Sequence, residues 1–139
     1  MIQGHQSGIE VYGEQRGAAF GDFNSDGKVD LAVTQNGAAT KLFENRGAAS
    51  GLTVRLEGPP RNRDGIGASV RLLYEDGSAG PRREVQTGVG YWSQGSSTQV
   101  LGAAKPAAQI EVTWPDGQVD TRHVVEEERV YRIPYADEE

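Results

Sequence analysis

The chain has 139 residues with 19 glycines, six prolines and no cysteine, and its 20 acidic side chains outnumber 14 basic ones, giving a net charge of −6 at pH 7. The missing cysteines exclude disulfides, thiol catalysis and cysteine-ligated zinc. The negative charge argues against nucleic acid as a partner, since phosphate binding needs a basic face. No apolar run reaches the ~20 residues of a membrane-spanning helix, and no signal segment opens the chain.

The glycine and proline content, together with 36% hydrophobic residues, favours short strands joined by many turns. The first expected strand covers residues 9–12, where Ile9 and Val11 are separated by a polar residue. A second apolar stretch, residues 18–20, leads directly into a polar loop.

That loop, residues 22–30, carries an oxygen-bearing side chain at every second position before Gly27 allows a sharp turn. Calcium prefers six to eight oxygen ligands at roughly 2.3–2.6 Å, and a bound divalent cation offsets the repulsion between clustered carboxylates. The predicted ligands are the side chains of Asp22, Asn24, Asp26 and Asp30 and the carbonyl of Lys28.

Two other interpretations of the loop stand beside the calcium site. Asn, Asp and Gly also dominate ordinary turns between strands. An EF-hand needs an acidic residue at the twelfth position, which here is Val33. After the loop, apolar and polar residues alternate over 29–34, so the loop is expected to lead into a strand instead of a helix.

Residues 40–44 form the next expected strand, and the glycine-rich segment 45–51 is the expected boundary between two units. The predicted units are residues 1–49 and 50–135, followed by an acidic tail at 136–139. A lone first unit leaves strand edges and apolar faces uncovered, so it is expected to pack on the second unit, to pair with another copy through exposed edges, or to have lost neighbouring blades.

The stretch from Arg16 to Val33, followed by residues 41–47, resembles one FG-GAP/VCBS repeat, the calcium-loop blade unit of integrin-type β-propellers. The resemblance implies that the same five loop residues hold Ca²⁺. The chain contains one such unit.

The second half alternates apolar and polar residues in short segments separated by turn signals such as Glu75-Asp76-Gly77 and Pro115-Asp116-Gly117. Pro106 and short length argue against a helix in the alanine-rich segment 102–109. The predicted strands are 52–57, 67–74, 82–87, 110–114, 119–125 and 130–133. The predicted fold is therefore all-β: a single calcium-loop blade unit packed on an antiparallel sandwich or barrel-like domain.

Two loops of the second half are candidate ligand surfaces. Gly65 and Gly67, with Arg61 and Arg63, offer backbone N–H groups and positive charge to an anion, or the glycines merely meet backbone constraints at a strand entry. The segment Tyr91-Trp92-Ser93-Gln94 offers aromatic rings, a hydroxyl and an amide to a sugar or a peptide, or it plugs one end of the sandwich.

Three segments in order resemble the ASPIC/UnbV domain, which follows FG-GAP/VCBS repeats in the cartilage acidic protein-like family. They are the segment from Asn62 to Val70, the segment from Gly90 to Gln94, and the turn from Trp114 to Gly117. The family's His-Phe-Gly-Leu-Gly segment falls on Thr98 to Gly102, where only Leu-Gly is kept. The resemblance implies extracellular calcium binding and adhesion-like recognition, and no reaction.

The sequence holds no arrangement typical of a catalyst. Ser93 lacks the glycines of a nucleophile elbow, and neither His5 nor His123 has a second histidine nearby. The expected function is a calcium-binding, non-catalytic recognition module, extracellular or periplasmic, with an unknown protein or glycan as partner. A calcium-stapled self-assembly unit and a carbohydrate-binding or enzyme accessory module are the alternatives.

Overall fold

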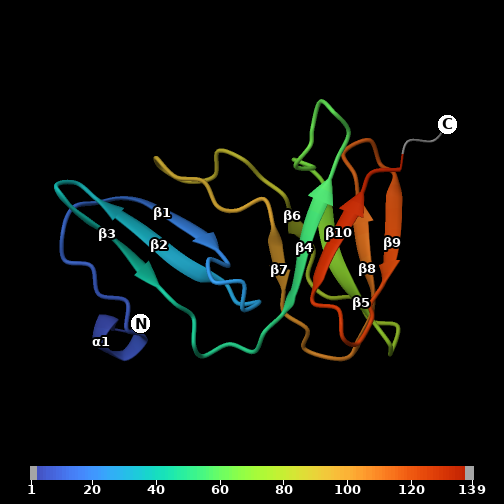
Figure 1. Cartoon of the computed structure of the whole chain (residues 1–139), viewed down its shortest axis with the longest axis horizontal. Coiled ribbons are helices and arrows are strands. Elements are labelled where there is room, and N and C mark those ends of the chain that lie inside the picture. The colour runs from blue at the N-terminus through green and yellow to red at the C-terminus, as the bar shows by residue number, and fades with distance from the viewer. Residues whose placement is uncertain (1–2, 137–139) are drawn as a thin grey trace.

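Three sheets organise residues 3–136, which are the residues that the computed structural model describes (Figure 1). Helix is confined, within that range, to the unpredicted single turn α1, Gly4–Ser7. The strands are β1 Gln15–Gly21, β2 Asp30–Gln35, β3 Ala38–Phe43, β4 Leu52–Glu57, β5 Ser69–Tyr74, β6 Arg83–Glu84, β7 Gln99–Leu101, β8 Ala107–Thr113, β9 Val119–His123 and β10 Val130–Pro134. The all-β prediction is confirmed, and residues 137–139 of the expected tail lie outside the described range.

The first sheet is antiparallel in the order β1-β2-β3, with Phe20 opposite Leu31 and Ala32 opposite Leu42. Its one buried hydrophobic side chain among the described residues is Val33. The predicted strand at 9–12 is wrong, because that stretch crosses beside the sheet without joining a ladder. Its carbonyls at Glu10 and Val11 accept side-chain donors instead, from Lys41 of β3 and from Gln15 of β1, both at 2.9 Å.

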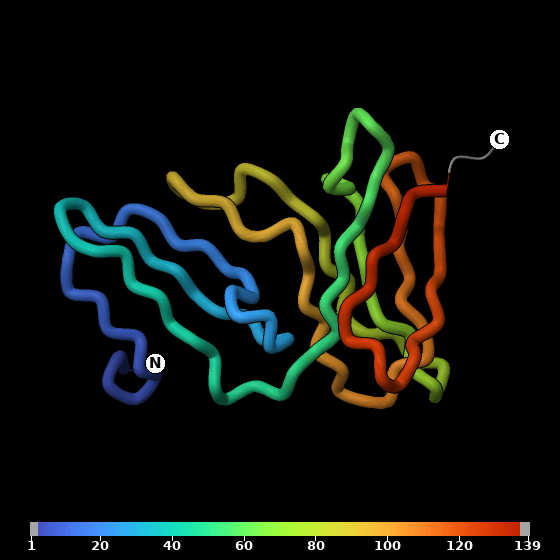
Figure 2. The backbone as a smooth tube through the Cα atoms, viewed as in Figure 1, coloured from blue at the N-terminus to red at the C-terminus, as the bar shows by residue number. Residues whose placement is uncertain are grey.

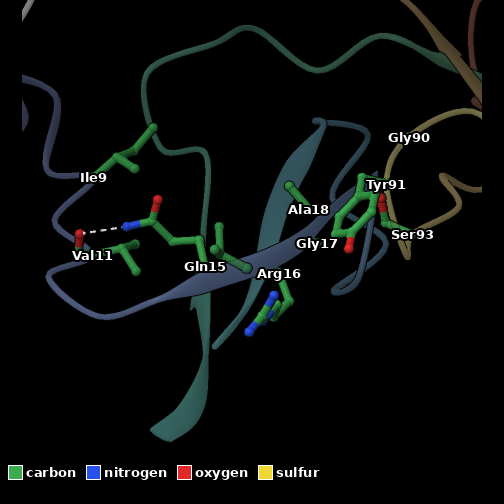
Figure 3. A pocket seen from close by; sticks show the side chains of 10 residues that line it. Ile9, Val11, Gln15, Arg16, Gly17, Ala18, Gly90, Tyr91 and Ser93 are labelled. Atoms are coloured by element: carbon green, nitrogen blue, oxygen red, sulfur yellow. Dashed lines mark hydrogen bonds between the residues drawn. The ribbon is translucent and has the colours of Figure 1, made fainter. Parts of the chain in front are cut away.

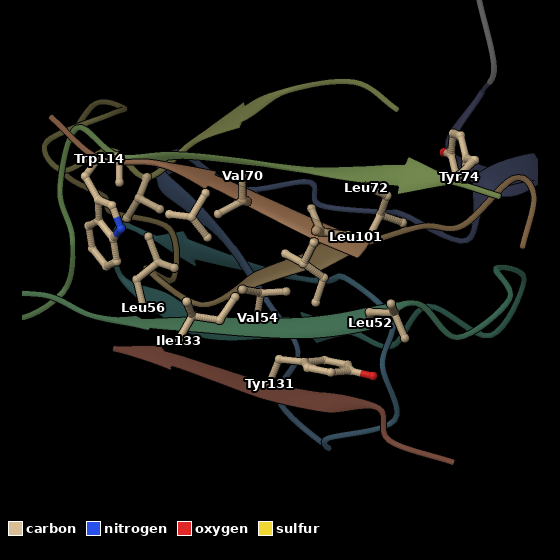
Figure 4. Packing of buried hydrophobic residues seen from close by; sticks show 14 residues of the cluster. Leu52, Val54, Leu56, Val70, Leu72, Tyr74, Leu101, Trp114, Tyr131 and Ile133 are labelled. Carbon is tan, nitrogen blue, oxygen red and sulfur yellow. The ribbon is translucent and has the colours of Figure 1, made fainter. Parts of the chain in front are cut away.

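The second unit is a sandwich of two sheets, ordered β10-β4-β7 and β6-β5-β8-β9. Alternation in the sequence places one side of β4, β5, β8 and β10, and Leu101 of β7, in the core between the sheets (Figure 4). The central residues are Val54, Val70, Ile110 and Val112, all fully buried. One ladder departs from the expected antiparallel pattern, since β10 runs parallel to β4.

Trp114 closes one end of this core with 2% of its surface exposed. Its indole Nε1 donates to Asp120 at 2.6 Å, and its ring meets Tyr135 edge-on at a centroid distance of 5.2 Å. The polar atom of a large buried ring is thereby satisfied. Trp114 is therefore part of the core.

The first sheet contributes no side chain to the sandwich core, whose members run from Leu52 to Ile133. The two units meet instead through the linker before β4 and through a long connection between β6 and β7. Figure 2 traces this connection, in olive and yellow, from the sandwich toward the first sheet. Ser96 on the connection donates its N–H to the carbonyl of Phe20 in β1 at 3.0 Å.

No helix within residues 3–136 has the length and apolar character that a membrane-spanning helix needs.

Gly65 supports a testable prediction about the core, because its φ of +64° favours glycine and its missing side chain leaves room for Leu56 and Trp114. A Cβ there would lie 2.9 Å from the Leu56 Cβ.

Gly77, with φ +79° and open space around it, is the matched control. Gly65→Ala should lower the free energy of unfolding by about 1–3 kcal/mol more than Gly77→Ala, because both substitutions strain the backbone and only the first overpacks the core. Urea denaturation of the two variants measures the difference, and equal losses would contradict the packing role.

Candidate functional site

The predicted cation loop joins β1 to β2 and turns on two residues with positive φ. Ser25 has φ +61° and Gly27 has φ +78°. A serine in this region is uncommon, and its backbone is strained unless surrounding contacts hold it. Those contacts come from the loop's own oxygens.

Asp22 and Asn24 direct their side-chain oxygens to the same donor. The N–H of Asp26 lies 3.0 Å from Asp22 Oδ1 and 3.1 Å from Asn24 Oδ1. The second oxygen of Asp22 accepts the N–H of Gly27 at 2.9 Å. The loop therefore folds around the first two predicted ligands and brings their oxygens together.

Asp26 carries a counter-ion from its own loop. Its Oδ1 accepts the Lys28 N–H at 2.9 Å, and its Oδ2 lies 3.3 Å from Lys28 Nζ. Desolvation raises the pKa of Asp26, but the hydrogen bonds from Lys28 and Asn24 outweigh it and leave the pKa below the ordinary value. The carboxylate is thus ionised at neutral pH and already shares a monovalent cation.

Asp30 is the one buried charged side chain among the described residues, 3% exposed. Its two oxygens accept the N–H of Phe23 at 3.1 Å and the N–H of Asn45 at 2.8 Å. The Asn45 side chain adds a bond to the Val29 carbonyl at 3.2 Å. Asp30 therefore ties the start of the loop to the segment that leaves β3.

The donor set fits a hard cation in its chemistry. Within residues 3–136 no three His, Cys, Asp or Glu side chains gather into a metal-binding group by themselves, so a site here depends on an amide and a carbonyl as well as carboxylates. Those are ligands that Ca²⁺ accepts and that zinc disfavours. A carboxylate oxygen that accepts one N–H keeps a second lone pair for a cation. The residues that would hold the ion are Asp22, Asn24, Asp26, Lys28 through its carbonyl, and Asp30.

The same loop is bonded to the entrance of the sandwich. Ser50 Oγ donates to the Asp26 carbonyl at 2.7 Å, and the Gly51 N–H donates to the Gly27 carbonyl at 2.7 Å. Gly51 is itself pressed against β7, since a Cβ there would lie 2.5 Å from the Leu101 carbonyl oxygen. The conformation of residues 26 and 27 is therefore coupled mechanically to the first residue of β4.

The candidate surface at Tyr91 to Gln94 lies on the connection that reaches the first sheet, and it does not plug the sandwich. Tyr91 and Trp92 are 67% and 82% exposed, with ring centroids 6.0 Å apart. Trp92 has φ +52°, which is an outlier for a bulky residue. Gly17 in β1 admits this segment, because a Cβ at Gly17 would lie 2.7 Å from the Trp92 carbonyl oxygen.

Arg61 and Arg63 belong to the loop between β4 and β5, which stands at the top of Figure 1, away from the connection that carries the Tyr91 segment. Asn62 between them holds that loop with bonds to the N–H and the carbonyl of Ile66, both at 2.8 Å. The structure therefore does not bring the two arginines and the aromatic pair into one surface.

Sequence reasoning missed three contributors to the loop and to the contact between units. Asn45, Ser50 and Gly17 act through contacts to segments distant in the chain. From the sequence, Asn45 could be interpreted only as a turn residue. The roles of Ser50 and Gly17 could not be predicted, because they depend on contacts with residues that are distant in the sequence.

Comparisons with known proteins find one matching family and several similar proteins. The family described as ASPIC and UnbV matches residues 58–139. The chain is similar to Cartilage acidic protein 1 of Mus musculus, at 33% identity over 138 residues that cover 94% of this chain and 21% of that protein. It is similar at 33% identity to the Xenopus tropicalis and Homo sapiens proteins of the same name, over 86% and 84% of this chain. The chain spans about a fifth of the length of these relatives.

The close approach at Gly17 yields a second prediction. Gly17→Ala should displace the Tyr91 segment, because the new methyl group overlaps the Trp92 carbonyl. The amide of Ser96, which bonds to Phe20, should then exchange with solvent faster in NMR hydrogen exchange. Gly47→Ala is the matched control, since nothing lies within 4 Å of a Cβ there. Unchanged exchange at Ser96 would show that the segment does not rest on Gly17.

Proposed function

Because the chain belongs to the ASPIC and UnbV family, we propose that it is a calcium-binding, non-catalytic recognition module in which a blade-like unit precedes the family domain. The observation that carries the proposal is the loop at residues 22–30. Its side-chain oxygens recur at alternate positions, and those of Asp22 and Asn24 converge on one backbone donor. An extracellular setting is supported by the relatives, which are named for cartilage.

Electrostatics supports a divalent ion over the turn interpretation. Three aspartates within nine residues repel one another, and the Lys28 ammonium is paired with Asp26 alone among the described residues. A doubly charged cation would relieve the rest. Such loops in extracellular modules bind Ca²⁺ with dissociation constants on the order of 10⁻⁴–10⁻³ M, which suits a permanently calcium-rich environment.

A calcium-stapled assembly unit is the second candidate, because the first sheet exposes large apolar side chains. Phe20 of β1 and Leu42 of β3 are 59% and 68% exposed. Both side chains line a groove of about 790 Å³. Apolar exposure of this kind marks interaction surfaces. A carbohydrate-binding role draws its support from the exposed rings of Tyr91 and Trp92.

Calcium binding is tested by two variants with opposite expected signs. Asp26→Asn removes a charged ligand while keeping its shape, and it should weaken Ca²⁺ affinity about tenfold or more. Lys28→Gln keeps the ligand carbonyl and removes the ammonium that competes for Asp26, and it should tighten affinity by up to about fivefold. Isothermal titration calorimetry measures both.

The control for charge alone is Asp64→Asn, on the exposed tip of the 58–66 loop, which should leave the affinity within twofold, as expected for a distant surface charge. The calcium proposal would be excluded if the wild-type titration showed no binding at millimolar Ca²⁺. It would also be excluded if Asp26→Asn and Lys28→Gln had the same dissociation constant for Ca²⁺.

The bonds between the loop and the linker generate a further expectation. If calcium stiffens residues 26–28, the Gly51 N–H that bonds to the Gly27 carbonyl should gain protection from hydrogen exchange when calcium is added. In Asp26→Asn the gain should vanish at the same calcium concentration. Gain of protection confined to residues 22–30 would contradict coupling to the sandwich.

A further inference from the structure

A cleft of about 590 Å³ lies between the first sheet, the chain that precedes it and the tip of the Tyr91 segment. Figure 3 shows Ile9 and Val11 at one end of this cleft and Tyr91 and Ser93 at the other. The floor between them is β1 from Gln15 to Ala18, together with Val33 of β2, which lies opposite Ala18. Its volume falls within the range of about 300–1,000 Å³ that is typical of ligand sites.

The floor of the cleft includes an outer strand edge, along which no described strand pairs with β1 on the side away from β2. β1 is the outermost strand of its sheet, and the Phe20 carbonyl bonds to Ser96 outside the sheet. Backbone groups in an antiparallel strand alternate in direction, so Ala18, two residues earlier, also points its N–H and carbonyl outward. No described residue outside the β1–β2 ladder bonds to either group.

The ends of the cleft provide side-chain contacts of two kinds. Ile9, which is 45% exposed, and Val11 give an aliphatic end, and the Tyr91 ring gives an aromatic end. Arg16 lies on the floor with half of its side chain exposed, and its ion pair with Glu14, at 3.3 Å, is also exposed. An exposed pair of this kind contributes little, so the guanidinium is available to a carboxylate of another molecule.

The Tyr91 end is held in place instead of being a loose loop tip. The absence of a side chain at Gly17 leaves room for the Trp92 carbonyl, Thr87 Oγ1 donates to Gln94 Oε1 at 2.9 Å, and the Ser96 N–H donates to the Phe20 carbonyl. The positive φ of Trp92 is maintained by these contacts. Backbone strain of about 1–3 kcal/mol that persists in a folded protein often accompanies a binding role.

We propose that this cleft binds an extended, acidic peptide segment of a protein partner, which adds to the edge of β1 at Ala18. The peptide backbone would form hydrogen bonds with the N–H and the carbonyl of Ala18. These bonds would lie on the same edge of β1 as the bond from the Ser96 N–H to the Phe20 carbonyl. An apolar peptide side chain would contact Val11 or Tyr91, and an acidic one would pair with Arg16. This is strand addition, in which main-chain bonds supply affinity and side-chain contacts supply selectivity.

Three features favour this occupant. The contact with Ser96 at Phe20 already extends the same edge, so a peptide continues an existing interface. The exposed guanidinium of Arg16 complements an acidic peptide. The chain preceding β1 and the Tyr91 segment enclose the edge from both ends, which suits a single strand better than the edge of a folded second copy. An acidic peptide would be the partner in the recognition role proposed above, and binding of the peptide does not require calcium.

The decisive variant is Ala18→Pro, which removes the outward N–H of an edge strand without breaking the ladder to β2. The probe is a phage-displayed library of random heptapeptides selected on the wild-type protein, with selected sequences resynthesised for fluorescence polarisation. Peptides with alternating apolar residues and an acidic residue should be enriched. Ala18→Pro should weaken their binding at least about tenfold, and Tyr91→Ala should also weaken it.

Thr121→Pro is the matched control, because Thr121 is exposed on the free edge of β9 and its N–H also points away from the ladder. It should leave peptide binding unchanged. Peptides N-methylated at alternate residues should lose binding to the unaltered protein, which keeps the test valid if Ala18→Pro fails to fold.

Several results would overturn the proposal. Selected peptides that bind wild-type protein and Ala18→Pro equally, or N-methylated peptides that bind as well as their parents, would exclude strand addition. A wild-type dimer in analytical ultracentrifugation that Ala18→Pro abolishes would assign the edge to a second copy. Calcium titration of Ala18→Pro should match wild type, so failure of the peptide experiment is distinguishable from failure of the calcium site.

Discussion

The carboxylate of Asp30 is the contact on which the first unit depends. The first sheet buries one hydrophobic side chain, Val33, among the described residues, so apolar burial contributes little to its stability. Asp30 instead joins the start of the loop at Phe23 to the chain after β3 at Asn45 through two backbone N–H groups. A buried charge is tolerated when hydrogen bonds satisfy it, and removing a partner leaves an expensive unpaired group. The unit is therefore held by polar bonds that close around one loop.

The polar bonds around this loop also connect the first sheet to the sandwich. The loop that Asp30 anchors also carries the predicted cation ligands, and its carbonyls at Asp26 and Gly27 are bonded to Ser50 and Gly51. Gly51 has no space for a side chain because β7 lies directly against it. A change in the loop would therefore reach the sandwich through these hydrogen bonds, without passing through a shared hydrophobic core.

In the sandwich, by contrast, apolar burial contributes more to stability than polar bonds do. Its core joins both sheets, and the fully buried Val54, Val70, Ile110 and Val112 lie at its centre. Its outer face is tied by Glu111, whose pKa is lowered chiefly by the hydrogen bond from Arg71, at 2.7 Å, and further by Arg82. The stable domain thus provides a rigid support from which the long connection between β6 and β7 extends to the first sheet. Residues that meet a ligand are often found on such connections because the scaffold holds their ends.

Much of this could be predicted from the sequence where the signal was local. Alternation of Leu52, Val54 and Leu56 predicted β4 and its buried side, and the Glu75-Asp76-Gly77 turn marked the end of β5. The same reasoning failed at residues 9–12, where two alternating apolar residues lie beside a sheet and pair with no strand. It also gave no sign of β7, which is three residues long and exists because β4 lies next to it.

The spacing of aspartates, glycines and apolar residues determined by itself the all-β class, the positions of most strands and the loop that could hold a cation, because each of these depends on neighbours within a few residues. Tertiary structure alone decided that β10 runs parallel to β4, that the Tyr91 segment leaves the sandwich for Gly17, and that the Arg61 loop stands apart from it. Those outcomes depend on contacts between residues tens of positions apart, and no local pattern specifies which distant backbone will satisfy a given hydrogen bond or fill the space beside a glycine.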